Sequence, residues 1–193
     1  SPRLFDAVRV RNLEVRNRLW VSPMCQYASI KQDGRVEEWH RVHYGSMTRG
    51  GAGMVITEAT AVTPEGRISP QCLGIWSDDH AEDLRQIVDF AHAQGTAMGV
   101  QLAHAGRKAS TRVWFPGHDR LSVPLDEGGW ETVAPSPIAS EGLREPIELS
   151  TTAIDDIIAA FVSAADRAVR VGFDLLEIHA AHGYLIHDFL SPF

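Results

Sequence analysis

The chain alternates three times between an amphipathic segment that ends in glycine and a short apolar run. The amphipathic segments span residues 37–53, 78–95 and 151–172, and the runs after them read MVITEA, TAMGVQL and FDLLEIH. Apolar positions three and four residues apart are typical of helices, and short, nearly all-apolar runs are typical of buried parallel strands. RLWVS at 18–22 adds an earlier strand. The pattern predicts the order β-α-β-α-β-α-β, an α/β fold with a parallel sheet.

Local signals support this assignment. In the third amphipathic segment, Thr152 with Asp155 resembles a capping box, and Gly172 suits the left-handed position after a helix. One helical face collects its apolar side chains: Ile154, Ile157, Ile158, Phe161, Val162, Ala165, Ala168 and Val169. Ahead of the alternation, VRV and LEV on either side of Arg11-Asn12 predict a small hairpin that closes one end of the fold.

Polar residues follow each predicted strand where it ends. The four strand ends read PMCQY, Glu58-Ala59-Thr60, Gln101-Leu102-Ala103-His104 and His179-Ala180-Ala181-His182. In α/β barrels the carboxyl ends of the strands carry the active site. No strand-to-helix turn has a GxGxxG or GxxxxGK[ST] motif, so the nucleotide-fold signals are missing. The long segment 104–149, rich in Pro, Gly and Trp, is predicted to cap the site.

The HxxH pair His179 and His182 has three interpretations. The histidines are metal ligands, or side chains satisfied at a strand end, or two donors that converge on one oxygen as an oxyanion clamp. Tyr184 beside them is a candidate proton donor. Cys25 is either a nucleophile or a small buried residue, and the Gln101 amide suits recognition of a flat heterocycle.

Composition narrows the function classes. A net charge of -7 argues against nucleic acid or an anionic membrane surface as the main partner. Cys25 and Cys72 make no disulfide framework and no metal-type spacing, which favours a reducing compartment. No apolar run approaches the ~20 residues of a membrane span, and the start lacks the order of a signal peptide. We therefore expect a soluble cytoplasmic protein.

Five stretches, in order, resemble the Old Yellow Enzyme family of flavin-dependent ene-reductases. They are SPMCQY, VITEATAV with PEGRI, GIWSD, QLAHAGRK and IHAAHGYLIHDFLSP. The cysteine in PMCQY makes the resemblance closest to the YqjM-like, or xenobiotic-reductase-like, branch. The resemblance implies a TIM (β/α)8 barrel that binds FMN non-covalently at its carboxyl mouth, accepts electrons from NADPH or NADH, and reduces an activated alkene or nitro compound.

The resemblance also assigns roles to residues. It implies that the flavin is bound by Ser22, Pro23, Met24, Cys25, Ala59, Gln101 and His179. It implies that the substrate meets Tyr27, His179, His182 and Tyr184, with the histidines gripping its oxygen and Tyr184 donating the proton. Arg107 and Lys108 are placed near the site, Trp114 in the 104–149 capping subdomain, and no metal ion is implied.

The length departs from the family. A complete barrel needs about 250 residues, whereas this chain supplies the first four strand-helix units. We therefore expect residues 1–193 to be the amino-terminal half of a flavin-binding barrel. It is then a fragment, a chain completed by a complementary carboxyl-terminal half, or a half-barrel that forms a homo-oligomer. Two alternatives to an ene-reductase stay open: a half-barrel without independent catalysis, and a metal-dependent barrel lyase or hydrolase that uses HxxH.

Overall fold

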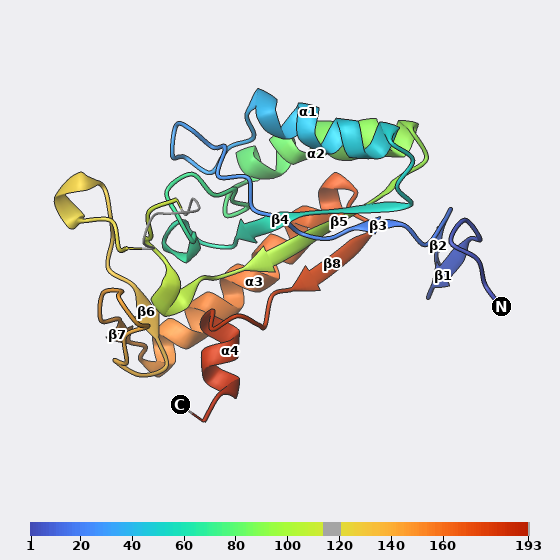
Figure 1. Ribbon diagram of the computed structural model, residues 1–193. Coiled ribbons are helices and arrows are strands. Elements are labelled where there is room, and N and C mark those ends of the chain that lie inside the picture. Colours follow the sequence, from blue (N-terminus) through green and yellow to red (C-terminus); the bar gives the residue numbers. More distant parts are fainter. Residues whose placement is uncertain (114–120, 193) are drawn as a thin grey trace.

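The centre of the molecule is a four-stranded parallel sheet (Figure 1). The computed structural model describes residues 1–113 and 121–192. The strands lie in the order β3 (Trp20–Val21), β4 (Met54–Ala61), β5 (Ala97–Ala103) and β8 (Leu175–Ile178), all parallel. Helices α1 (Glu38–Arg49), α2 (Asp78–Ala93) and α3 (Thr151–Val171) connect them in turn. The predicted alternation is confirmed, although the strand expected at 18–22 is only two residues long.

The three helices pack on the same side of the sheet. The main core combines their apolar faces with β4 and β5, and includes Tyr44 of α1, Leu84 of α2 and Ala168 of α3 around Val55 and Val100. Every residue of β4 is buried, as expected for a strand with neighbours on both sides and both faces covered.

A hairpin lies at the amino end of the sheet (Figure 1). Strands β1 (Val8–Val10) and β2 (Leu13–Val15) pair antiparallel, as the sequence predicts. Val15, Met54 and Ile56 form a second small core there, against which Trp20 and Leu175 pack. The hairpin therefore lies opposite the end at which the polar strand ends gather.

The ends of α3 correct one prediction and confirm another. The N-cap is Ser150, whose hydroxyl accepts a hydrogen bond from the Ala153 amide, so the predicted capping box of Thr152 and Asp155 is wrong. Thr152 instead lies inside the first turn of the helix, and Asp155 follows that turn. Gly172 has φ 99°, the left-handed conformation predicted for the residue that ends this helix.

One side of α3 and the edge strand β8 leave large apolar side chains exposed in the described part of the chain. Ile158, Val162 and Ile178 are 57 %, 57 % and 61 % exposed. Together with Phe161 and Phe189 they line an apolar groove of about 400 Å³ between α3 and helix α4 (Leu185–Leu190). The predicted apolar face of α3 exists, but only part of it is buried.

In residues 104–113 and 121–149, the described parts of the predicted cap, the elements are short. These are η2 (Gly106–Lys108), η3 (Leu125–Glu127), and the two-residue strands β6 (Val133–Ala134) and β7 (Ile147–Glu148), which pair in parallel. Trp114 lies outside the described residues. That this segment is a capping subdomain stays a prediction.

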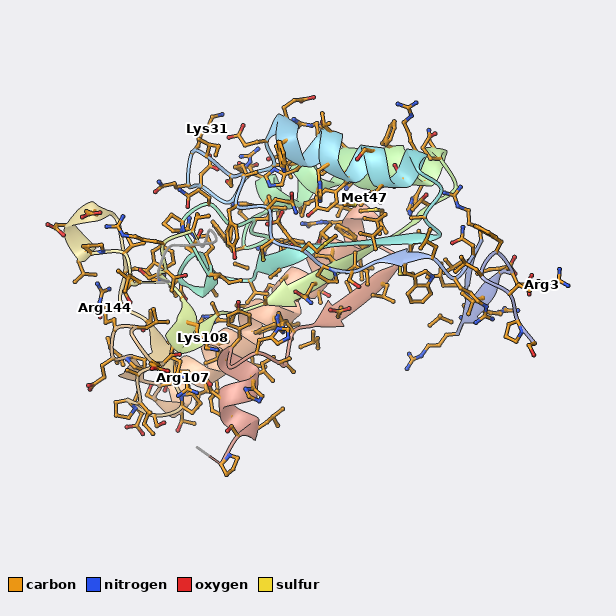
Figure 2. All side chains as sticks on the ribbon, viewed as in Figure 1. Arg3, Lys31, Met47, Arg107, Lys108 and Arg144 are labelled. Carbon is orange, nitrogen blue, oxygen red and sulfur yellow. The ribbon has the colours of Figure 1, made fainter. Side chains whose placement is uncertain are left out.

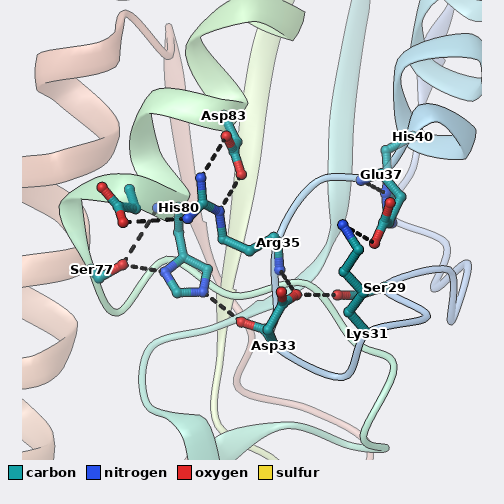
Figure 3. Close-up of polar contacts among 10 residues, drawn as sticks. Ser29, Lys31, Asp33, Arg35, Glu37, His40, Ser77, His80 and Asp83 are labelled. Atoms are coloured by element: carbon teal, nitrogen blue, oxygen red, sulfur yellow. Dashed lines mark hydrogen bonds and ion pairs between the residues drawn. The ribbon is translucent and has the colours of Figure 1, made fainter.

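The loop between β3 and α1 is tied to the start of α2 by polar contacts (Figure 3). Arg35 forms an ion pair with Asp83 and also contacts Asp79. The His80 ring contacts the Asp33 carbonyl at 2.8 Å. These contacts fix the loop that follows Ser22–Cys25, the segment predicted to bind the flavin, and Tyr27. Within the described residues, no helix is long and apolar enough to cross a membrane.

Candidate active site

Three aromatic rings meet just beyond the carboxyl end of β8. The His179 and His182 rings have centroids 5.1 Å apart, and the Tyr184 ring lies 4.9 Å from His179 and 6.5 Å from His182. All three pairs are edge-to-face, with interplanar angles of 87°, 86° and 83°. The predicted HxxHxY constellation is thus a spatial cluster, because the chain turns sharply after the strand.

Hydrogen bonds to nearby backbone groups orient His179. Its amide donates to the Leu102 carbonyl, which extends the ladder between β5 and β8. Its Nδ1 accepts a hydrogen bond from the Ala181 amide at 3.3 Å, which leaves the proton on Nε2. Burial and, second, the neighbouring His182 lower the pKa of His179, which favours the neutral ring. A neutral imidazole with an Nε2–H is a hydrogen-bond donor.

The loop that carries His182 is held from both sides. His182 itself has φ 61°, an uncommon conformation for a residue with a side chain. Lys108 Nζ donates to its carbonyl at 2.6 Å, and the next amide, of Gly183, donates to His187 Nδ1 at 3.0 Å. Such contacts offset the conformational cost at His182 and hold its backbone in place.

Segment η2 and helix α4 form the frame of this loop. Arg107 forms an ion pair of 3.0 Å with Asp188, whose side chain is almost fully buried. Gly106 has φ 57°, and a Cβ there would lie 2.9 Å from the Leu185 Cα, so only glycine allows this approach. Figure 2 shows Arg107 and Lys108 beside α4 on this side of the molecule. Both cations therefore lie beside the loop that carries His182.

Residues far apart in the sequence meet in one small cluster. Its buried part is made mostly of small residues from β4, β5 and the segments that follow them, including Ala59, Ala103 and Ala105. Cys25, Tyr27 and Tyr184 pack against it from the segment after β3 and the loop after β8. The structure thus brings together four residues that the sequence assigned to one site: Cys25, Tyr27, Ala59 and Tyr184.

Gln101 lies next to this cluster in the sheet. It pairs with Ala59 on β4 and with Glu177 on β8, and its Nε2 contacts the Glu177 carboxylate at 2.5 Å. Ser22 and Met24 are exposed in the segment that leaves β3, with Pro23 half-buried between them. These side chains form a row across the carboxyl edge of the sheet.

Sequence reasoning named Glu58 at a strand end but gave it no role and did not predict that its carboxyl group is buried. Glu58 is fully buried within β4 and contacts His40 and Tyr44 of α1. The signal was present, since Glu58 is the one charged residue in the run MVITEATA. Among residues 1–113 and 121–192, no group of three or more His, Cys, Asp or Glu side chains is arranged to hold a metal ion.

Known proteins provide an independent comparison. The chain matches the NADH:flavin oxidoreductase / NADH oxidase family over residues 3–193. It is 44 % identical over 192 residues to an NADPH dehydrogenase of Bacillus velezensis, an alignment that covers 98 % of this chain and 52 % of that protein. It is 46 % identical over 191 residues to the NADPH dehydrogenase of Listeria welshimeri, with the same coverage of 98 % and 52 %.

Solved structures agree with these relatives. Morphinone reductase superimposes with a TM-score of 0.83 at 29 % identity, over 99 % of this chain and 51 % of its own. The Old Yellow Enzyme homologue of Zymomonas mobilis gives a TM-score of 0.80 at 30 % identity, over 99 % and 52 %. The chain spans about half the length of the curated relatives it matches.

The fold class is therefore confirmed. The solved relatives are TIM barrels, and this chain corresponds to about half of one, with four parallel strands and the helices that follow them. The match over nearly all residues and the convergence of the predicted site residues lead to the same family. The chain belongs to the NADH:flavin oxidoreductase / NADH oxidase family, which includes the Old Yellow Enzymes.

Proposed function

We propose that the protein is an ene-reductase that uses FMN, reduced by NADPH or NADH, to reduce an activated alkene such as an enone, or a nitro compound. The observation that carries the proposal is the meeting of the His179, His182 and Tyr184 rings beside the cluster of Cys25, Tyr27 and Ala59. Membership of the family supports the flavin, and the names of the relatives support a nicotinamide reductant.

The described residues fit the ring system of a flavin. The small side chains of Ala59, Ala103 and Ala105 suit the packing of a flat ring against the sheet edge. The Gln101 amide and the His179 Nε2–H supply polar groups suited to the carbonyl and nitrogen edge of a flat heterocycle. Met24, 49 % exposed, and Cys25 give an apolar flank on the same edge. We propose that these residues, with Ser22 and Pro23, hold the ring.

The chain's own residues then prepare the substrate. Bound FMN supplies the hydride that reaches the β-carbon. His179 and His182 donate hydrogen bonds to the substrate's carbonyl or nitro oxygen, where negative charge develops, and such a pair stabilises that charge more than the ground state. The Tyr184 hydroxyl passes its proton to the α-carbon, and the Tyr27 phenol lines the substrate side.

The phosphate of FMN needs residues beyond this set. Arg107 and Lys108, the cations placed beside the site, already contact Asp188 and the His182 carbonyl. We propose that the carboxyl-terminal half of a barrel holds the phosphate and covers the apolar groove between α3 and α4. The relatives support this occupant, because they are about twice as long as this chain. A homo-oligomer of half-barrels is the competing arrangement.

The product of the complete gene tests the proposed function. We expect it to purify with the visible absorption bands of FMN and to oxidise NADPH or NADH faster when cyclohex-2-enone or a nitroalkene is added. Protein without flavin, with no NAD(P)H oxidation after FMN is supplied, would support the non-catalytic alternative. Stoichiometric zinc in place of flavin would support the metal-dependent one.

A lysine substitution tests how the histidine loop is held. In Lys108→Met the donor to the His182 carbonyl is lost while most of the side-chain length remains, so the loop loses one fixed point. We expect kcat/KM for the enone to fall on the order of tenfold with flavin still bound, because small displacements of a catalytic group are costly. Steady-state kinetics measure this. Lys31→Met is the matched control, since Lys31 is exposed and pairs only loosely with Glu37 at 3.8 Å. Equal kinetics for both variants would remove Lys108 from this role.

A further inference from the structure

Glu58 is a buried carboxyl group for which the proposed mechanism has no use. Its side chain has no exposed surface, although it belongs to a strand that is otherwise free of charge. The pairing of β4 with β5 shifts register between Thr57 and Ala59, so the strand is irregular at this residue. A buried carboxyl group is costly unless donors surround it.

Donors do surround it, and they come from two other parts of the chain. The Gln26 amide, in the segment after β3, donates to Glu58 Oε2 at 3.1 Å. The Tyr44 hydroxyl, from α1, donates to Oε1 at 3.1 Å and accepts from the Glu58 amide at 3.0 Å. The carboxyl group thus joins α1, β4 and the segment between Cys25 and Tyr27 at one point.

His40 completes the group. Its Nδ1 accepts a hydrogen bond from the Glu37 amide, so its proton lies on Nε2 (Figure 3). That buried Nε2 lies 3.6 Å from Glu58 Oε1 and has no hydrogen-bond partner. Burial lowers the pKa of His40 to about 4, so the ring is neutral at pH 7. His40 thus places a neutral N–H group close to the carboxyl group, without adding a charge beside it.

Glu58 titrates in the physiological range in this environment. Burial raises its pKa to about 7, against the hydrogen bonds from the Gln26 and Tyr27 amides and from Tyr44, which act to lower it. The other titratable groups near the cluster are Cys25 next to Tyr44, Cys72 in the segment before α2, and His43 and Arg41 on α1. Cys72 is protonated, because burial raises its pKa to about 12.

The segment that Glu58 holds carries two of the predicted site residues. Gln26 lies between Cys25 and Tyr27, and both neighbours pack into the site cluster. Tyr27 has φ 51°, a conformation that side-chain-bearing residues rarely adopt and that needs support from its surroundings. The Gln26 side chain is fixed as well, by contacts with the Met24 carbonyl and the Trp39 indole.

We propose that Glu58 is a positioning residue of the site: its carboxyl group, with Tyr44 and His40, holds the Cys25–Tyr27 turn, and the gain or loss of its proton changes how that turn presents the Cys25 thiol and the Tyr27 phenol. The consequence for flavin and substrate rests on the function proposed above. The effect of the Glu58 proton on the Cys25 thiol can be measured without a bound cofactor.

Alkylation of Cys25 tests this in the complete gene product, with FMN and after its removal. Iodoacetamide labelling, followed by mass spectrometry of the Cys25 peptide on both sides of pH 7, gives the rate as a function of pH. Ionised Glu58 disfavours a nearby thiolate, so the parent profile should show a step near pH 7. In Glu58→Gln we expect that step to vanish and the rate above pH 7 to rise about threefold or more. With FMN bound, the variant should also lose a pH-dependent change in the flavin spectrum near pH 7.

Two further variants complete the experiment. Glu38→Gln, an exposed glutamate on the same helix as Tyr44, should behave as the parent. Tyr44→Phe keeps the ring in the core but removes a hydrogen bond that lowers the pKa of Glu58, so the step should move to higher pH. If Glu58→Gln fails to fold, Tyr44→Phe still tests the inference. A parent profile without the step, or a step unchanged in either variant, overturns the inference. Absence of flavin would overturn the proposed function and leave the flavin-free profile as a valid test.

Discussion

Replacing His182 with alanine is expected to lower kcat/KM for cyclohex-2-enone about 100-fold while FMN stays bound. The residue contributes one of two rings that meet 5.1 Å apart at the end of β8, and its backbone is fixed by Lys108. Loss of one donor from a preorganised pair costs most where charge develops, in the transition state. Stopped-flow measurement of the flavin's reoxidation by the enone isolates that step.

A histidine at the other end of the sheet is the control. His92 pairs with Asp174 at 2.8 Å near the amino ends of the strands, so His92→Ala should leave reoxidation unchanged. A fall of less than about threefold in His182→Ala would count against the clamp and favour a mainly structural pair. A fall of less than about threefold, together with a metal ion bound to the protein, would support the interpretation of the HxxH histidines as metal ligands.

The fold could be predicted because its signals are local. Three amphipathic segments and four apolar runs each form the expected element, and parallel order follows from their alternation. The errors lie at boundaries, where neighbouring residues compete for the same role. Ser150 rather than Thr152 caps α3, because the helix begins one residue before Thr152 and Thr152 lies inside its first turn.

The site could be predicted as far as parallel strands dictate it. Because strand ends of a parallel sheet meet at one edge, Cys25, Ala59, Gln101 and His179 had to be neighbours. The contact of Glu58 with Tyr44 and His40 could not be derived this way. It depends on which face of α1 packs over β4, and on a shift of register within β4. Such details are set by packing rather than by local pattern.

The apolar groove is the point at which the sequence and this chain's structure differ most. Periodicity places Ile158 and Val162 on the apolar face of α3, yet each is 57 % exposed here. The next strand, β8, is an edge strand with Ile178 61 % exposed. An edge strand and an apolar face of this kind favour association with another segment. Both observations are explained if the carboxyl-terminal half of the barrel covers this surface, as we propose.

Replacing Ile158 with aspartate in the complete gene product is therefore expected to lower the free energy of unfolding by about 3 kcal/mol or more, because a charge would be buried without a partner. Chemical denaturation followed by circular dichroism measures this change. Ala159→Asp is the matched control: it is the next residue of α3, exposed and not part of the groove, and should change stability by no more than about 0.5 kcal/mol. If Ile158→Asp were as mild as its neighbour, Ile158 would be solvent-exposed in the whole protein. The carboxyl half could then not be the segment that covers the groove, and the barrel arrangement proposed here would be wrong at α3.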